Sequence, residues 1–243
     1  MSRSKAIMRW MTIVLMTALL TACASLPSGS TADPRDPFER YNRAMFEFND
    51  SVDRAVVKPL AEVYRDYVPP LAQQSLRNFF GNLRDVIITA HQLFQGKLEA
   101  AGTAGGRVLV NTTLGFLGVA DPASEMGLVK TNEDFGQTFG RWGAESGPYF
   151  MLPLLGPSTV RDAIGTVADF SFDPIGSVFN QSAARNVVYG LIAIDRRKDL
   201  LDAQGTIEAL SFDRYTGVRD AWLARRRSLI YDGDPPPSPM KEE

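Results

Sequence analysis

Hydrophobic residues recur at the three- and four-residue spacing of a helix along most of this chain. The first such run opens with Asp36-Pro37-Phe38-Glu39, where Asp36 can cap the helix, Pro37 suits its first turn and Glu39 completes a capping box. The apolar face of the run is formed by Phe38, Tyr41, Met45, Phe48 and Val52, with Phe46 to one side of it. We therefore predict a helix that begins at Asp36.

Later segments show the same spacing and predict helices over 59–68, 71–95, 97–114, 161–170, 181–201 and 211–231. Pro59 suits a helix start, and Pro69-Pro70 separates the first two of these helices. Gly81 predicts a kink or break within the segment 71–95. Because no pair of segments alternates between polar and apolar residues, the pattern predicts an all-α protein.

One apolar segment does not have helical spacing. Residues 142–158 have the sequence WGAESGPYFMLPLLGPS, in which Pro148, Pro153 and Pro157 exclude a long regular helix. Two interpretations fit it. It is either a kinked loop buried on the core, or an apolar hairpin at a lipid boundary that borders a wet cavity.

The N-terminal segment 1–22 has the pattern of a secretory signal peptide. Basic residues at 3, 5 and 9 precede the apolar run 10–20, which is about half the ~20 residues that a membrane-spanning helix needs. Leu20-Thr21-Ala22-Cys23 then resembles a bacterial lipobox, which implies cleavage before Cys23 and its attachment to lipid. By resemblance to the lipoprotein sorting rule, Ala24 and Ser25 favour the outer membrane over the inner one.

The mature chain divides into three parts by composition. Residues 23–35 predict a flexible tether, 36–232 a helical domain, and 233–243, with four prolines, a disordered tail. Removal of residues 1–22 takes away three of the 26 basic residues and none of the 28 acidic ones, which leaves a net charge of −5. An acidic exported chain is poorly suited to bind nucleic acid.

Candidate catalytic groups are scarce. One cysteine and one histidine exclude a Cys-rich zinc site and a multi-histidine metal centre. The remaining enzymatic interpretation is an exported lipase or acyltransferase with Ser158 as nucleophile and His91 as base, but His91 lies within a helical pattern. The alternative is that Ser158 caps the helix before Arg161. We predict no catalytic residues, no metal site and no cofactor.

Two groups of charged residues have a structural and a functional interpretation. Asp162, Asp169 and Asp173 could act as catalytic carboxylates, but solvated or arginine-paired side chains fit their helical setting better. The basic runs Arg196-Arg197-Lys198 and Arg225-Arg226-Arg227 are either solvated faces or contacts for anionic lipid headgroups.

The sequence resembles the MlaA/VacJ family of outer-membrane phospholipid-transport lipoproteins along most of the mature chain. The resemblance is carried by DPFE (36–39), YNR (41–43), FN (48–49), KP (58–59), YRDYVP (64–69), NFFGNL (78–83), LFQG (93–96), EDFGQT (133–138), GPY (147–149) and LPLLGPS (152–158).

The resemblance implies a ring-like helical body with a central amphipathic channel, embedded in the inner leaflet of the outer membrane and anchored by lipidated Cys23. It also implies removal of phospholipid that has strayed into the outer leaflet. The implied partners are phospholipid, a trimeric porin, and a soluble periplasmic carrier that feeds an inner-membrane ABC transporter complex. A structural porin-associated lipoprotein without transport activity is the alternative, and a soluble lipid carrier is a further one.

Two sets of residues become candidates for the lipid path. We hypothesise that Tyr149, Phe150, Met151, Leu152, Leu154 and Leu155 line or gate it, with Gly143, Gly147 and Gly156 as hinges. Phe46, Phe48 and Asn49 of the first helix lie where the family's Asn- and Phe-rich helix contributes to the ring. Packing in the core explains Phe48 at least equally well.

Overall fold

The computed structural model describes residues 33–179, 181–201 and 213–236. Its helices before the hairpin are α2 (Glu39–Val52), the π-helical turn η1 (Asp53–Val57), α3 (Lys58–Tyr67), α4 (Pro70–Phe94), α5 (Leu98–Thr113), α6 (Pro122–Glu125) and α7 (Phe135–Arg141). A hairpin of β1 (Tyr149–Leu152) and β2 (Gly156–Thr159) precedes α8 (Val160–Phe172), α9 (Pro174–Val178), α10 (Ser182–Asp199) and α12 (Arg214–Ile230).

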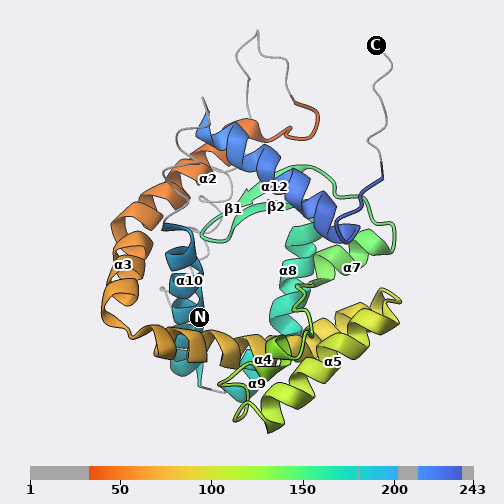
Figure 1. Ribbon diagram of the computed structural model, residues 1–243. Helices are drawn as coiled ribbons and strands as arrows, with labels where there is room; N and C mark the ends of the chain where they lie inside the picture. The colour runs from red at the N-terminus through yellow and green to blue at the C-terminus, as the bar shows by residue number, and fades with distance from the viewer. Residues whose placement is uncertain (1–32, 180, 202–212, 237–243) are drawn as a thin grey trace, which may run out of the picture.

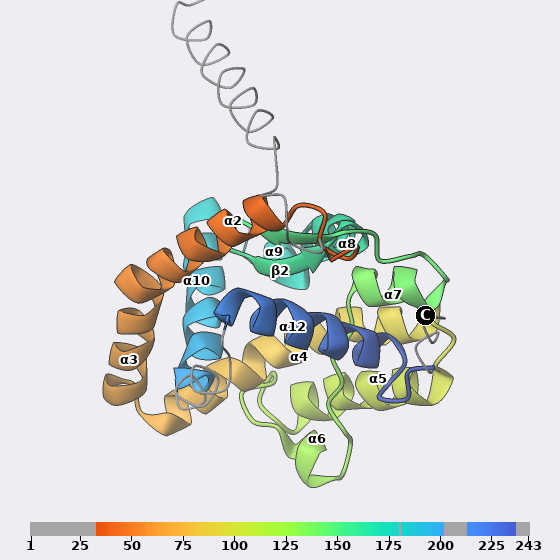
Figure 2. The same cartoon turned by 90° about the horizontal axis from the view of Figure 1, so that it is seen from above.

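The helices are arranged around a ring. Figure 1 shows α2, α3, α4 and α8 on successive sides of it, with α12 and the hairpin completing the side next to α2. α4 packs against α5, α7 against α8, and α10 against α3. Figure 2 shows the same elements from above, with α6 projecting beyond the end of α5. Among the described residues, no helix combines the length and apolar character needed to cross a membrane.

The fold is mostly helical, but the prediction of an all-α protein is wrong at residues 149–159. Here β1 and β2 pair antiparallel, with Tyr149 opposite Thr159 and Leu152 opposite Gly156. Tyr149 and Met151 are buried on one face of β1, while Phe150 packs on the other face against Tyr41 at 4.9 Å between ring centroids. Because both faces of β1 contact protein, its sequence shows no alternation that could have indicated a strand.

Two asparagines of α2 hold the free edge of β1. Asn42 accepts a hydrogen bond from the backbone N–H of Met151 at 2.8 Å and donates one to the carbonyl of Tyr149 at 3.2 Å. Two helical turns further on, Asn49 accepts from the N–H of Leu154 at 2.7 Å and donates to the carbonyl of Leu152 at 2.9 Å. The amides therefore take the place of a neighbouring strand and satisfy backbone groups of the hairpin.

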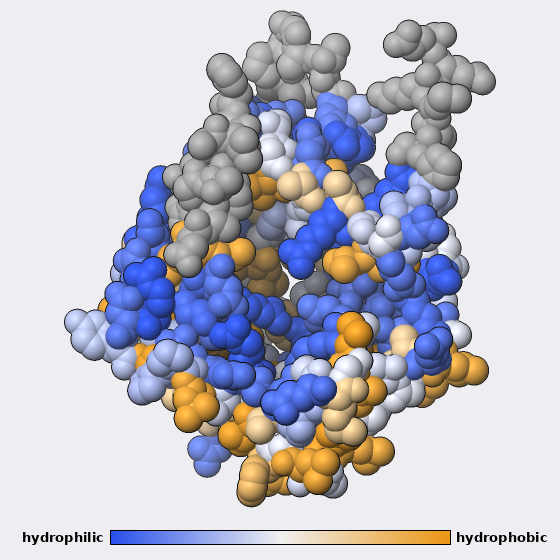
Figure 3. Space-filling view, in the orientation of Figure 1, coloured by the Kyte–Doolittle hydropathy of each residue, from blue (hydrophilic) through white to orange (hydrophobic). Residues whose placement is uncertain are grey.

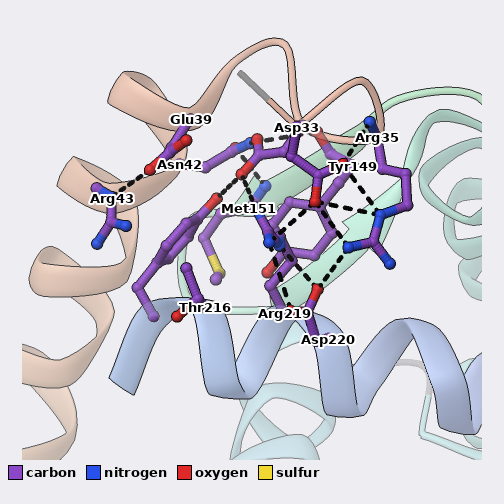
Figure 4. A network of polar contacts seen from close by, with 12 residues as sticks. Asp33, Arg35, Glu39, Asn42, Arg43, Tyr149, Met151, Thr216, Arg219 and Asp220 are labelled. Atoms are coloured by element: carbon purple, nitrogen blue, oxygen red, sulfur yellow. Dashed lines mark hydrogen bonds and ion pairs between the residues drawn. The ribbon is translucent and has the colours of Figure 1, made fainter. Parts of the chain in front are cut away.

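The first helix begins at Glu39 without a side-chain cap, so the predicted capping role of Asp36 is wrong. Asp36 is buried and faces inward, where Asn42, Tyr215 and Arg219 donate hydrogen bonds to its carboxylate. Figure 4 shows this network between the chain before α2 and the helix α12. The carboxylate oxygens of Asp36 accept hydrogen bonds in this network and therefore do not bind the N–H groups at the start of α2.

The segment assigned to the tether is partly ordered into the same network. Asp33 forms an ion pair with Arg219 at 3.0 Å, and Arg35 forms one with Asp220 at 3.1 Å. The N–H of Tyr149 also donates to the carbonyl of Arg35 at 2.8 Å. Asp33 and Arg35, within the predicted tether, therefore already contact the body of the protein. Cys23, the leader 1–22 and the tail residues 237–243 lie outside the described residues.

Helix α4 continues through Gly81, so a break at this position is wrong, while a kink stays a prediction. A Cβ atom at Gly81 would collide with the ammonium group of Lys130. The glycine therefore makes room for a side chain from a different segment and does not interrupt the helix. The other predicted helices are confirmed, with ends shifted by a few residues; residues 211 and 212 of the last one lie outside the described residues. The π-helical turn η1, which joins α2 to α3, was not predicted.

Arg107 links α4, α5 and α6 through a buried polar cluster. Its guanidinium contacts Asp85 at 3.2 Å and Asp121 at 2.9 Å, and donates to the carbonyl of Leu128 at 2.6 Å. Burial raises the pKa of Asp85. Burial also acts on Asp121, but hydrogen bonds from Ser124, Asn111 and Arg107 bring its pKa down to about 2.

We expect Arg107→Ala to lower the free energy of unfolding by about 3–5 kcal/mol, because Asp85 would keep its buried charge without its closest cation. Lys130 stands 3.8 Å from Asp85 and would compensate only in part. Urea unfolding followed by circular dichroism measures the effect. The exposed Arg141→Ala is the control, with an expected change within about 0.5 kcal/mol. A loss below about 1 kcal/mol for Arg107→Ala would contradict this account of the cluster.

Candidate functional site

A cavity of about 550 Å³ lies inside the ring of helices. Its wall is built from α3, α4, α8, α9 and α10, together with the segment 130–134 before α7. Figure 3 shows that the face seen in Figure 1 is hollowed at its centre, with hydrophilic and hydrophobic residues both bordering the hollow. The cavity thus collects side chains from segments that are far apart in the sequence.

Part of the cavity wall is hydrocarbon. Among the apolar side chains that line it are Leu76, Phe80, Ile87, Phe170, Leu191 and Ile192. They come from one side of α4, from the end of α8 and from the middle of α10. Long helices supply them at helical spacing, so a sequence pattern cannot distinguish them from residues of a dry core.

Most acidic residues of the wall already have donors or cations. Asp195 and Asp199 form ion pairs with Arg77 at 3.3 and 3.4 Å. Glu133 pairs with Lys97 at 3.1 Å. Asp173 accepts a hydrogen bond from the hydroxyl of Tyr189 at 2.7 Å, and burial together with this bond raises the pKa of Tyr189 to about 12.

Asp134 joins the cavity wall to α12. Its carboxylate lies 2.6 Å from the guanidinium of Arg226, which also contacts Asp162 at 3.0 Å. Burial alone would raise the pKa of Asp134, but the hydrogen bonds and charge of Arg226 bring it down to about 2. Asp134 also caps α7 by accepting from the N–H of Gln137 at 2.8 Å. These contacts connect Asp134 of the cavity wall to α12 and, through Arg226, to Asp162 of α8.

Besides Arg77, which pairs with Asp195 and Asp199, the wall holds three cationic side chains: Arg84 of α4, Lys130 of the loop between α6 and α7, and Arg196 of α10. Sequence reasoning missed Arg84 and Lys130, and treated Arg196 only as one of a basic run. The run is divided by the fold: Arg197 binds Asp53 at 2.7 Å, and Lys198 binds Asp199 at 3.1 Å. The interpretation of these runs as solvated faces is therefore wrong for Arg197 and Lys198. It is also wrong for Arg226 of the second run, which is paired with Asp134 and Asp162.

The predicted hairpin residues divide into two groups. Tyr149 and Met151 form a buried core cluster with Tyr215. Partly buried apolar side chains pack against this cluster: Met45, Phe46, Trp222 and Leu223. Leu154 and Leu155 stand at the hairpin turn and are 68% and 59% exposed. Phe150 and Leu152 are half-buried. None of the six lines the cavity described above, and their gating role stays a prediction.

The three glycines proposed as hinges have backbone angles that favour glycine. Gly143, Gly147 and Gly156 have φ values of 93°, 66° and 85°, in the left-handed region. At Gly147 a Cβ atom would also press on Val160 at 3.2 Å. These angles explain why glycine occupies the positions, while movement at them stays a prediction.

In the first helix the three predicted contacts have separate roles. Phe46 packs edge-on against Tyr215 with ring centroids 5.9 Å apart, so it is a core residue. Phe48 is largely exposed, and the alternative that it packs in the core is wrong. Asn49 binds the hairpin, as described above.

Ser158 and His91 do not form a catalytic pair. His91 is fully buried, and its Nδ1 lies 3.0 Å from the hydroxyl of Thr138. Ser158 is buried and donates to the carbonyl of Thr159 at 3.2 Å. Thr159, not Ser158, caps α8 by accepting from the N–H of Asp162, so the alternative role of Ser158 as a cap is also wrong.

The three candidate catalytic aspartates are held by structural contacts. Asp162 contacts Arg161 at 3.1 Å as well as Arg226, which confirms the arginine-paired interpretation for it. Asp169 accepts from the N–H of Phe135 at 3.1 Å, and Asp173 is held by Tyr189. Within the ranges that the structure describes, no group of acidic, histidine or cysteine side chains is arranged to hold a metal ion.

The fold and the cavity define a class of protein: a mostly helical ring around a cavity whose wall combines hydrocarbon with charged groups. A model of the family described as "MlaA lipoprotein" matches residues 34–229, and the chain belongs to this family of non-enzymatic lipoproteins. The identification agrees with the resemblance seen in the sequence.

Named relatives align over nearly the whole chain. The intermembrane phospholipid transport system lipoprotein MlaA of Escherichia coli (strain K12) is 36% identical over 93% of this chain and 90% of its own. The protein of that name from Haemophilus influenzae is 29% identical over 92% of this chain and 90% of its own. A solved chain reported under "Structural basis for maintenance of bacterial outer membrane lipid asymmetry" matches with a TM-score of 0.70 and 34% identity, covering 80% of this chain and 98% of that one.

Proposed function

We propose that this protein transports phospholipids between membranes, removing mislocalised phospholipid from the outer leaflet of the outer membrane and so maintaining lipid asymmetry. The relatives named for intermembrane phospholipid transport, at 36% and 29% identity over almost the whole chain, support this function. The observation that carries it is the cavity inside the ring, whose wall holds both apolar and charged side chains.

The mixed wall suits the two parts of a phospholipid. Each CH₂ group of an acyl chain gains about 0.8 kcal/mol when it is removed from water, so an apolar wall favours the chains. A charged headgroup is costly to bury without polar partners. A passage with Phe80 and Ile192 beside Arg84 and Arg196 offers surface for both parts, and we assign it as the central amphipathic channel.

We place the protein in the inner leaflet of the outer membrane, facing the periplasm and anchored by lipid on Cys23. Exposed apolar residues support contact with lipid, among them Leu109, Leu114, Phe116 and Leu117 at the end of α5 and in the loop after it. Apolar groups of this size at neighbouring surface positions mark interaction sites with membranes or partners. The exposed turn at Leu154 and Leu155 is proposed to gate the lipid path.

The proposed partners are phospholipid, a trimeric porin and a soluble periplasmic carrier that delivers lipid to an inner-membrane ABC transporter complex. The alternative is a structural porin-associated lipoprotein with no transport activity of its own. A variant that still binds the porin but no longer clears outer-leaflet phospholipid would decide against this alternative.

The proposed function is tested by asking whether phospholipid enters the cavity. A photoreactive amino acid placed at Thr166, on the cavity wall, should form adducts with phospholipid in intact cells. Adducts only with protein, under conditions in which the cells clear outer-leaflet phospholipid, would contradict a path through this cavity.

A further inference from the structure

Three cationic side chains converge on the cavity from separate segments. Arg84 extends from α4, Arg196 from α10 and Lys130 from the loop between α6 and α7, and all three line the same space. The ammonium group of Lys130 lies against Gly81, where a Cβ atom would force it to shift. The packing of α4 therefore admits the third charge.

Arg84 and Arg196 lack the carboxylate partners that other charged groups of the wall have, and Lys130 shares its carboxylate with Arg107. In the part of the chain that the structure describes, no carboxylate lies within 4.0 Å of Arg84 or Arg196. Lys130 is 3.8 Å from Asp85, but that carboxylate is held more closely by Arg107 at 3.2 Å. Asp195, one residue before Arg196, is engaged by Arg77 at 3.3 Å and Lys198 at 3.5 Å.

The charge of Arg84 acts on both of the other cations. Burial, and then the charge of Arg84, lowers the pKa of Arg196. Burial lowers the pKa of Lys130, with Asp85 acting against it and Arg107 and Arg84 adding to it. Like charges placed together in a partly enclosed space cost free energy unless an anion joins them.

We propose that Arg84, Arg196 and Lys130 form an anion-binding subsite of the cavity that holds the phosphate group of a phospholipid. This inference rests on the proposed function and adds to it the headgroup chemistry and the residues. Guanidinium groups bind phosphate through paired, charge-assisted hydrogen bonds, and an ammonium group adds a compact charge. Phe80 and Ile87 line the same cavity, so the acyl chains of such a ligand have apolar surface nearby.

The shared chemistry is a phosphate group, which a lipid headgroup or free phosphate could supply. The test uses the full lipoprotein in non-ionic detergent, with fluorescent phosphatidylglycerol, diacylglycerol of the same acyl chains, and sodium phosphate as separate probes. The variant is Arg84→Gln/Arg196→Gln. The matched control is Arg54→Gln/Arg141→Gln, which removes the same charge at two exposed arginines away from the cavity wall.

We expect the cavity variant to bind phosphatidylglycerol at least tenfold more weakly, since each charge-assisted hydrogen bond is worth about a factor of ten or more. Its affinity for diacylglycerol should change less than twofold, and the control should match the wild type for both lipids. Arg84→Lys/Arg196→Lys, which keeps the charge, should recover part of the lost affinity. Because neutralisation relieves repulsion, the melting temperature of the cavity variant should not fall.

Unchanged affinity of the cavity variant for phosphatidylglycerol overturns the subsite. Binding of sodium phosphate that requires Arg84 and Arg196, combined with lipid binding that does not, overturns the headgroup assignment and assigns the site to free phosphate. A wild-type protein that binds neither lipid overturns the proposed function, whereas a cavity variant that binds and clears phospholipid normally overturns the subsite alone.

Discussion

Thr166→Trp is expected to reduce clearance of outer-leaflet phospholipid at least tenfold, to about the level of cells without the protein. Thr166 stands on α8 in the wall of the cavity. Its hydroxyl donates to the carbonyl of Asp162 in the same helix, at 2.9 Å, so its replacement breaks no side-chain hydrogen bond between elements. An indole ring at this position would occupy the space through which we propose that lipid passes.

The matched control for this change is Thr103→Trp. Thr103 lies on α5, makes the corresponding bond to the carbonyl of Glu99 at 3.1 Å, and does not line the cavity. Outer-leaflet phospholipid is measured by labelling of intact cells, with the level of folded lipoprotein checked in the same membranes. Normal clearance by Thr166→Trp would contradict transport through the cavity, whereas loss in both variants would show a general effect of the added ring.

Leu154→Asp/Leu155→Asp is expected to abolish lipid clearance while leaving export and folding intact. Both leucines are exposed at the hairpin turn, where substitutions usually change stability by less than about 0.5 kcal/mol. Leu154 has a φ of 63°, a conformation that aspartate adopts more readily than leucine. Two carboxylates at the turn would be costly to place against acyl chains, so the turn could no longer contact lipid or gate the lipid path.

Leu71→Asp/Leu98→Asp provides the matched control. These leucines are also exposed, and they lie in the first turns of α4 and α5, where aspartate is compatible with the helix dipole. Clearance should be lost in the hairpin variant and kept in the control. Full clearance by the hairpin variant, at normal protein level, would rule out the proposed gating role of the turn.

The helices were predictable because their apolar residues follow helical spacing and because Pro59 and Pro69-Pro70 mark boundaries. The hairpin was not predictable from alternation, since Phe150 packs against Tyr41 while Tyr149 and Met151 enter the core. Asp36 had the sequence pattern of a helix cap, but the pattern contains no information about the distant Tyr215 and Arg219 that bind it.

The residues of the cavity could not be predicted from the sequence either, because the fold brings them together. Arg84, Lys130 and Arg196 come together only through the closure of the ring, and their spacing in sequence follows no motif. Gly81 did indicate something unusual, but its cause is the side chain of Lys130 and not a helix break. Asn49 was selected through the family resemblance, and the structure shows its contact with the backbone of β1.

The central claim is that phospholipid occupies the cavity inside the ring. The most direct measurement is mass spectrometry of adducts formed in living cells by a photoreactive residue at 166, compared with the same residue at 103. We expect phospholipid adducts at 166, a much lower yield at 103, and a lower yield at 166 when Arg84→Gln/Arg196→Gln is added. Equal phospholipid adducts at 166 and 103, or none at 166 in cells that clear outer-leaflet lipid, would contradict this claim.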